Sequence, residues 1–141
     1  MTRAKSTESH AEAIGLPAVT ESVGVRVLVT GATGFLGKRT CKALTDAGHR
    51  VWALSQTGGG STWHPEGLVR HSAHLLDEPF PEDLFDWEPE SVVHLAWSGI
   101  PDYGPACSLA NLKSQVAFID QIAEIPTVRR LLVAGTCFEY G

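Results

Sequence analysis

The stretch VRVLVTGATGFLGKRT, residues 25–40, constrains the fold of this chain more than any other part of the sequence. It opens with RVLVTG, a short apolar run of the kind found in a strand that is buried on both faces. Glycines follow at Gly31, Gly34 and Gly37, and residues 35–49 then place apolar side chains at helical spacing. The pattern predicts a buried strand, a glycine-rich turn and a helix, in that order.

The rest of the chain alternates in the same way between strand-like and helix-like segments. Further strands are predicted at 50–55, 68–76, 91–97 and 129–136, and helices at 79–87 and 108–125. Strands that alternate with helices form βαβ units, in which a parallel sheet carries helices on both faces. We therefore predict a Rossmann-type doubly wound α/β fold. The sequence ends after about five strands, so residues 24–141 are interpreted as the N-terminal portion of a longer domain.

The helix at 108–125 is predicted to be amphipathic. Its apolar residues recur every three or four positions and give the helix one apolar side, and we expect apolar helix faces of this chain to be left uncovered. These residues are Leu109, Leu112, Val116, Ile119, Ile122 and Ala123.

Composition and charge exclude several classes of function. The 141 residues carry 11 basic and 16 acidic side chains, and no Lys/Arg cluster is longer than a pair, which argues against a nucleic-acid surface. Cys41, Cys107 and Cys137 form no CxxC pair, which indicates reduced thiols in the cytoplasm and neither a metal site nor a disulfide framework. No apolar run approaches membrane-spanning length. Residues 1–23 lack the apolar core of a signal peptide and are predicted to be a disordered leader, with a functional arm as the alternative.

The three glycines have a chemical interpretation. A glycine-rich turn between a strand and a helix exposes backbone N–H groups at the positive end of the helix dipole, where phosphate binds. Gly31 would permit the tight turn, Gly34 the close approach of a pyrophosphate, and Gly37 close packing of helix on strand. The alternative is that they serve only a tight turn. With a strand before them and a helix after them, the glycines predict a dinucleotide-binding site.

Three motifs in order carry a resemblance to a known family. LVTGATGFLG resembles the TGxxGxxG fingerprint of the extended short-chain dehydrogenase/reductases, the NAD-dependent epimerase/dehydratase family acting on nucleotide sugars. VVHLAWSG is similar to the HLAA signature of the fourth strand, with Trp97 in place of the second Ala, and LLVAGTCFEYG resembles the SSxxxYG segment of the fifth. Asn111 matches the usual asparagine of the intervening helix. The likeness covers residues 25–141.

The resemblance implies NAD or NADP as cofactor and a nucleotide sugar as substrate, with a homodimer of the full-length protein as one candidate assembly. It implies cofactor contacts at Gly31, Thr33, Gly34, Phe35, Leu36, Gly37, Ser55, Gln56, Asp77, Leu95, Ala96, Trp97 and Asn111. Of these, Leu95, Ala96 and Trp97 would line the nicotinamide side with backbone and apolar surface. His94 precedes them in a buried strand and is expected to be a satisfied core residue.

Two residues bear on which dinucleotide binds. Ser55 and Gln56 end the second predicted strand, where an acidic residue would bind the ribose 2′-hydroxyl of NAD. Neither is acidic, and with Lys38 or Arg39 nearby the site would tolerate a 2′-phosphate, so the sequence favours NADP over NAD. The alternative is that both residues merely terminate a strand.

Two further roles are implied by the resemblance. Asp77 or His74 falls where the family keeps an aspartate that binds the adenine amine, with a surface-loop position as the alternative. Thr136 matches the catalytic Ser/Thr, whose hydroxyl would hydrogen-bond the sugar oxygen that becomes or was a carbonyl. A threonine that only ends a strand is the alternative for Thr136.

The family's catalytic base is missing from this sequence. The family uses a Tyr and a Lys spaced YxxxK, in which the lysine lowers the pKa of the tyrosine. Tyr103 is followed four residues later by Cys107, and Tyr140 stands one residue before the end. We therefore expect this chain to be the cofactor-binding part of a nucleotide-sugar epimerase, reductase or dehydratase, and to be inactive alone. The alternative is a non-catalytic NAD(P)-binding or redox-sensing module, which a downstream YxxxK would argue against.

Overall fold

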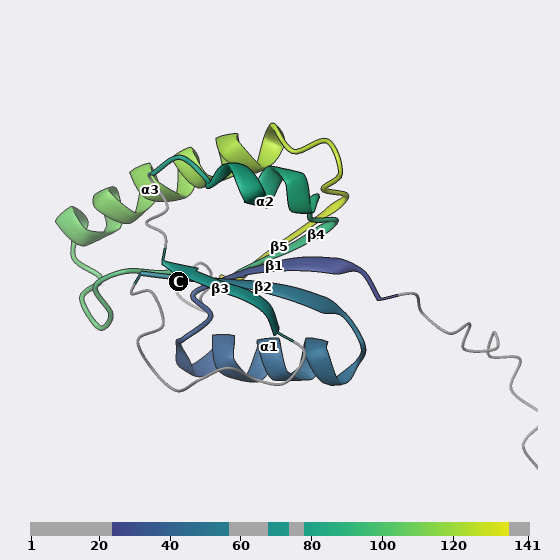
Figure 1. Cartoon of the computed structure of the whole chain (residues 1–141). Coiled ribbons are helices and arrows are strands. Elements are labelled where there is room, and N and C mark those ends of the chain that lie inside the picture. Colours follow the sequence, from purple (N-terminus) through teal and green to yellow (C-terminus); the bar gives the residue numbers. More distant parts are fainter. Residues whose placement is uncertain (1–23, 57–67, 74–77, 136–141) are drawn as a thin grey trace, which may run out of the picture.

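The computed structural model describes residues 24–56, 68–73 and 78–135 (Figure 1). Its elements, in chain order, are β1 (Arg26–Thr30), α1 (Phe35–Asp46), β2 (Arg50–Ser55), β3 (Leu68–Ala73), α2 (Glu82–Trp87), β4 (Ser91–His94), α3 (Pro105–Ala123) and β5 (Arg130–Val133). The order of strands and helices agrees with the alternation predicted from the sequence. Among the described residues, no helix is both long and apolar enough to cross a membrane.

The five strands form one parallel sheet in the order β3-β2-β1-β4-β5. β1 lies in the middle, and the chain reverses its direction across the sheet when β4 pairs with the free side of β1. α1 covers one face of the sheet, and α2 and α3 cover the other (Figure 1). The prediction of a doubly wound, Rossmann-type fold is therefore confirmed.

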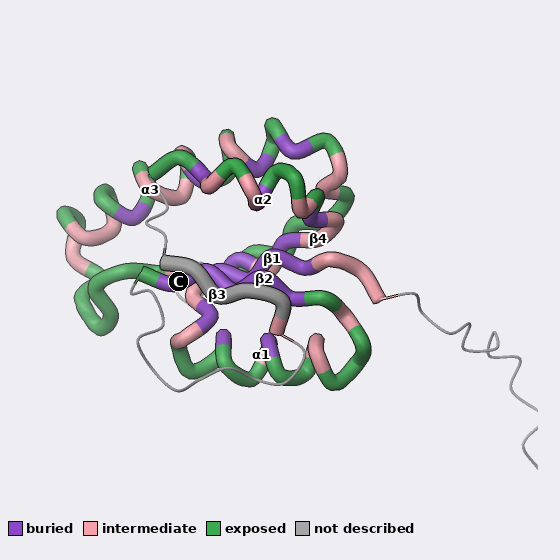
Figure 2. The backbone as a smooth tube through the Cα atoms, viewed as in Figure 1, coloured by how far each residue is buried: buried purple, intermediate pink, exposed green. Residues whose placement is uncertain are grey.

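Each face of the sheet has its own hydrophobic core, because successive side chains of a strand point to opposite faces. In β1, Leu28 packs under α2 and α3 with Phe80, Leu84 and Phe118. Its neighbours Val27 and Val29 belong to the other core, which packs under α1 and includes Cys41, Val51 and Ala53. The central strands are thus buried on both faces (Figure 2), as the continuous apolar runs predicted.

α3 does not pack on the sheet with its most apolar side. Of the six apolar residues that define this side, only Ile122 is buried, while the other five are exposed. The buried side instead carries Asn111, Phe118 and Ile122. The reason is that the loop after β4 has backbone groups that need hydrogen-bond partners, and Asn111 and Gln115 supply them. An apolar side of the helix could not do so.

β4 also ends earlier than predicted, at His94 and not at residue 97. The backbone N–H groups of Leu95 and Ala96 donate to the hydroxyl of Thr30, at 3.2 and 3.3 Å, instead of to a neighbouring strand. The segment that follows β4 is consequently a loop held against the end of β1.

The observed orientation of α3 gives a prediction about stability. Phe118 is fully buried and packs edge-on against Phe80, so Phe118→Ala should lower the unfolding free energy by about 3–5 kcal/mol. Leu112 is 58% exposed, so Leu112→Ala should change it by no more than about 0.5 kcal/mol. Chemical denaturation measures the unfolding free energy of both variants. A greater loss of unfolding free energy in Leu112→Ala than in Phe118→Ala would contradict the orientation of the helix.

Candidate functional site

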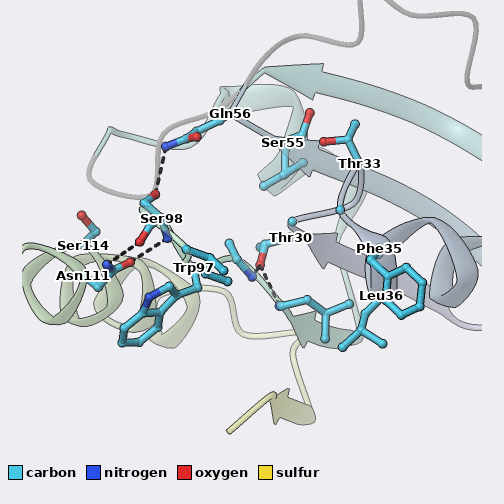
Figure 3. Close-up of a pocket in the computed structure, with 17 residues that line it drawn as sticks. Thr30, Thr33, Phe35, Leu36, Ser55, Gln56, Trp97, Ser98, Asn111 and Ser114 are labelled. Carbon is cyan, nitrogen blue, oxygen red and sulfur yellow. Dashed lines mark hydrogen bonds between the residues drawn. The ribbon is translucent and has the colours of Figure 1, made fainter. Parts of the chain in front are cut away.

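A cavity of about 390 Å³ opens at the carboxyl ends of β1, β2 and β4, where the strand order reverses (Figure 3). Ligands of open α/β sheets bind at such a reversal. The residues that were predicted to contact a cofactor and that line the cavity are Gly31, Thr33, Gly34, Phe35, Leu36, Gly37, Ser55, Gln56, Leu95, Ala96, Trp97 and Asn111. The fold thus brings together residues from four separate parts of the sequence, namely the glycine turn, the end of β2, the loop after β4 and α3.

Three predicted site residues are not described by the structure, and five residues that line the cavity were not predicted from the sequence. Asp77, His74 and Thr136 lie outside the described residues. The cavity is also lined by residues that the sequence analysis did not single out, namely Thr30, Leu54, Ser98, Ile100 and Ser114. Thr30, Leu54 and Ser98 each stand next to a predicted contact in the sequence, and Ser114 lies one helical turn after Asn111. Closeness to a predicted contact could therefore have identified these four residues, but not Ile100.

The turn between β1 and α1 leaves the helix N-terminus open to the cavity. Gly31 has a φ of +66°, and the N–H of Gly34 donates to its carbonyl at 3.0 Å, which closes the turn. Gly34 is the N-cap of α1, and no side chain of the described residues caps the helix there. The first N–H groups of a helix have no partner within it. Those of Phe35, Leu36 and Gly37 are therefore available to an acceptor in the cavity.

The three glycines are needed for different reasons. A Cβ on Gly31 would lie 2.9 Å from the backbone N of Ala96, and one on Gly37 would lie 2.6 Å from the Cα of Ala32. Both glycines are thus required by the packing of the chain on itself. A Cβ on Gly34 would meet only the Gly31 carbonyl, at 3.1 Å, and Gly34 is exposed. Only at Gly34 does the missing side chain leave space for something outside the chain.

The electrostatics of the cavity suit an anion at the helix end. None of the described residues that line it carries a charged side chain. An anion there meets the positive end of the α1 dipole and the open N–H groups without a competing carboxylate. The guanidinium of Arg39 lies 4.5 Å from the centroid of the Phe35 ring, which brings a positive charge close to the lining.

A buried hydrogen-bond network backs the opposite wall of the cavity. The Thr30 hydroxyl lies 2.7 Å from Nδ1 of His94 and accepts from the N–H groups of Leu95 and Ala96. His94 Nε2 is hydrogen-bonded to Gln115 Oε1, and Gln115 Nε2 donates to the carbonyl of Ala96 at 2.9 Å. The N–H groups of Leu95 and Ala96 and the carbonyl of Ala96 are therefore used within the protein.

A second set of contacts ties the loop after β4 to α3 and to β2. The Asn111 amide accepts from the N–H of Ser98 and donates to the Ser98 and Cys107 carbonyls, at 2.9, 2.9 and 3.0 Å. The hydroxyl of Ser98 accepts in turn from Nε2 of Gln56, at 2.9 Å (Figure 3). Both polar atoms of the Asn111 amide thus bind the loop at Ser98, and its nitrogen also binds the preceding turn of α3.

His94 is the titratable group closest to this site whose pKa is shifted. Burial lowers the pKa of His94 below its ordinary value of 6.5, and the hydrogen bond to Gln115 opposes this more weakly. His94 is 2% exposed, and its ring stacks on Phe118 with a centroid distance of 4.3 Å. His94 is therefore a neutral, satisfied core residue near neutral pH.

Comparisons with known proteins relate this arrangement to enzymes. The sequence model of the NAD dependent epimerase/dehydratase family matches residues 27–141. The dTDP-6-deoxy-L-talose 4-dehydrogenase (NAD(+)) of Aggregatibacter actinomycetemcomitans is 28% identical over 119 residues, which are 83% of this chain and 43% of that enzyme. The UDP-glucose 4-epimerase of Klebsiella pneumoniae is 31% identical over 86 residues, which are 51% of this chain and 58% of that enzyme.

A solved structure of an enzyme is also similar to this chain in its fold. TunA, an NAD dependent NDP-hexosamine 5,6-dehydratase involved in tunicamycin biosynthesis, has a TM-score of 0.65 at 27% identity, with 83% of this chain and 39% of TunA covered. The chain spans about half the length of the curated relatives it matches.

The lowered pKa of His94 predicts a dependence of stability on pH. As the pH falls below about 6.5, the unfolded chain binds a proton at this position that the folded chain does not, so the unfolding free energy decreases. The decrease should be at most about 1.4 kcal/mol per pH unit and should stop below the folded pKa. Denaturation at a series of pH values measures it. His94→Asn should reduce this slope, whereas His49→Asn, which retains His94, should keep the His94 contribution. Equal slopes for wild type and His94→Asn would refute the assignment.

Proposed function

Because the chain belongs to the NAD dependent epimerase/dehydratase family, as its three motifs predicted, we propose that it is the cofactor-binding part of a nucleotide-sugar oxidoreductase. One observation carries the proposal. The uncapped N-terminus of α1 opens, beside the bare backbone of Gly34, into a cavity without charged side chains among its described lining. A dinucleotide needs such a place for its pyrophosphate.

The residues present fit a nicotinamide dinucleotide along the whole cavity. The N–H groups of Phe35, Leu36 and Gly37 would hold the pyrophosphate. The adenosine half would lie towards Ser55 and Gln56 at the end of β2, and the nicotinamide half against the apolar wall at 95–97. The bound nicotinamide would donate or accept the hydride, while the protein positions it and keeps water from its face.

The substrate proposed is a nucleotide-linked sugar. The names of the two curated relatives point to this class, since one acts on a dTDP-linked deoxy-sugar and the other on UDP-glucose. Thr136 is proposed to hold the sugar oxygen at which hydride transfer occurs. The sequence contains no YxxxK pair to exchange the accompanying proton, so we propose that the 141-residue chain alone does not turn over substrate. A homodimer of the full-length protein remains a prediction.

The relatives do not favour a non-catalytic sensor, since those reported above are named as enzymes. They also bear on the choice of cofactor. Both the talose dehydrogenase and TunA are named with NAD, which gives the predicted preference for NADP no support. The preference rests only on the absence of a carboxylate at Ser55 and Gln56.

Replacing Gly34 tests the proposed phosphate site. In Gly34→Leu the side chain would occupy the place of the pyrophosphate, and NADH should bind at least about 100-fold more weakly, since each charge-assisted hydrogen bond lost is worth about 1.5–3 kcal/mol. Titration calorimetry measures the affinity, and denaturation should find the fold retained. The matched control is Gly104→Leu at the glycine N-cap of α3, which does not line the cavity. Unchanged affinity in Gly34→Leu would count decisively against the site.

The cofactor preference can be tested at Ser55. If the predicted tolerance of a 2′-phosphate is right, wild type should bind NADPH at least as well as NADH. Ser55→Asp should then shift the ratio of the two affinities about tenfold towards NADH, the effect of roughly 1.4 kcal/mol of repulsion. Ser55→Asn, which has the same size and no charge, should leave the ratio near that of wild type. A clear wild-type preference for NADH would show the predicted NADP preference to be wrong.

A further inference from the structure

We propose that Gln115, His94 and Thr30 are positioning residues for the nicotinamide half of the cofactor, which act by fixing the backbone of Leu95 and Ala96 in the cavity wall. The inference rests on the proposed function, because it gives the network a role in binding a dinucleotide.

The hydrogen bonds of the network determine one another's direction. A threonine hydroxyl has one proton to donate and two lone pairs to accept with. The N–H groups of Leu95 and Ala96 occupy both lone pairs of Thr30 Oγ1, so its proton goes to Nδ1 of His94. The neutral ring then carries its own proton on Nε2 and donates it to Gln115 Oε1, which leaves the Gln115 amide nitrogen to donate to the Ala96 carbonyl. Each of these bonds admits only one arrangement.

The network ends on the part of the backbone that faces the cavity. It binds both N–H groups and one carbonyl of the Leu95–Ala96 segment, and the same segment lies so close to the glycine turn that a Cβ on Gly31 would be 2.9 Å from the Ala96 nitrogen. A change in any of these bonds would therefore move the wall relative to the phosphate-binding turn. Gln115 itself does not line the cavity, so it can act on a ligand there only through this backbone.

The surroundings of the network keep it rigid. Thr30 and His94 are 1% and 2% exposed, so water cannot readily replace a lost partner, and the ring of His94 stacks on the fully buried Phe118. Burial lowers the pKa of His94, which keeps the ring in the neutral form that the network requires. The wall is thus connected through buried groups to α3.

A second glutamine on α3 separates positioning from stability. Like Gln115, Gln121 accepts one hydrogen bond and donates to a backbone carbonyl. Its amide oxygen accepts from the N–H of Phe80 at 2.8 Å, and its amide nitrogen donates to the carbonyls of Glu78 at 3.0 Å and Ala117 at 3.4 Å. Both glutamines are half-buried, but Gln121 contacts the segment before α2 and not the cavity wall. Gln115→Met and Gln121→Met therefore remove similar hydrogen bonds from similar places.

The experiment measures the affinities of both variants and of wild type for NADH and for ADP, which lacks the nicotinamide half. Gln115→Met should bind NADH roughly three- to tenfold more weakly, the effect of losing about one net hydrogen bond, and should bind ADP as wild type does. Gln121→Met should bind both ligands as wild type does, even if its stability falls equally.

A second pair of variants and a second measurement cover the case in which Gln115→Met does not fold. Thr30→Val removes the hydroxyl and keeps the branched shape, whereas Thr30→Ser keeps the hydroxyl. Amide hydrogen exchange at Leu95 and Ala96 should become faster in Thr30→Val and should be restored towards the wild-type rate in Thr30→Ser.

The outcomes distinguish this inference from the proposed function. Failure of wild type to bind NADH would overturn the proposed function and with it the role given to the network. Wild-type binding together with unchanged NADH affinity in Gln115→Met, or an equal loss for NADH and ADP, would overturn the positioning role alone. If amide hydrogen exchange at Leu95 and Ala96 were unchanged in Thr30→Val, the network would not be what fixes the backbone of the wall.

Discussion

The structure depends above all on the central position of β1, which pairs with β2 on one side and with β4 on the other. A strand in this position is buried on both faces and at both edges, so its backbone groups are satisfied only if both neighbours are in register. Its carboxyl end must then leave the sheet in a sharp turn, and Gly31, with a positive φ, makes that turn directly against the backbone of Ala96. Gly31 and Ala96, which meet at this turn, also lie on two sides of the cavity.

The turn shows how one short motif serves both folding and ligand binding. Gly31 and Gly37 are fixed by contacts within the chain, and substitutions there would be felt by the fold. Gly34 is less constrained by the fold, since a Cβ there would meet only the Gly31 carbonyl at 3.1 Å, and it leaves α1 without a side-chain cap. A Ser, Thr, Asp or Asn cap in its place would stabilise the helix by only about a few tenths of a kcal/mol, because glycine is itself tolerated at the N-cap. The glycine gives up that stabilisation and leaves the helix end open to an anion.

Much of this could be predicted from the sequence, and the errors have a common physical cause. The strands around Val27–Val29 and Val51–Ala53 were predictable because both of their faces are apolar, and the turn because three glycines join a strand to a helix. The side of α3 that packs on the sheet was not predictable in this way, because Leu112 and Val116 are apolar enough for a core and are nevertheless exposed. Asn111 and Gln115 pack there because the loop after β4 needs hydrogen-bond partners, and that loop exists only once Thr30 has ended the strand. These are non-local polar contacts, which periodicity cannot detect. The position of Ser98 in the cavity lining could not be predicted for the same reason, because it depends on hydrogen bonds to Asn111 and Gln56, which are distant in the sequence.

The most direct test of the central claim is to follow the backbone amide resonances of the 141-residue chain while NADH is added. If the dinucleotide binds as proposed, the largest shifts should occur at the open N–H groups of Phe35, Leu36 and Gly37, with further shifts at Gln56 and Trp97 on either side of the cavity. Shifts confined to the outer side of α3, around Leu112 and Val116, or no shifts at saturating NADH, would contradict that claim.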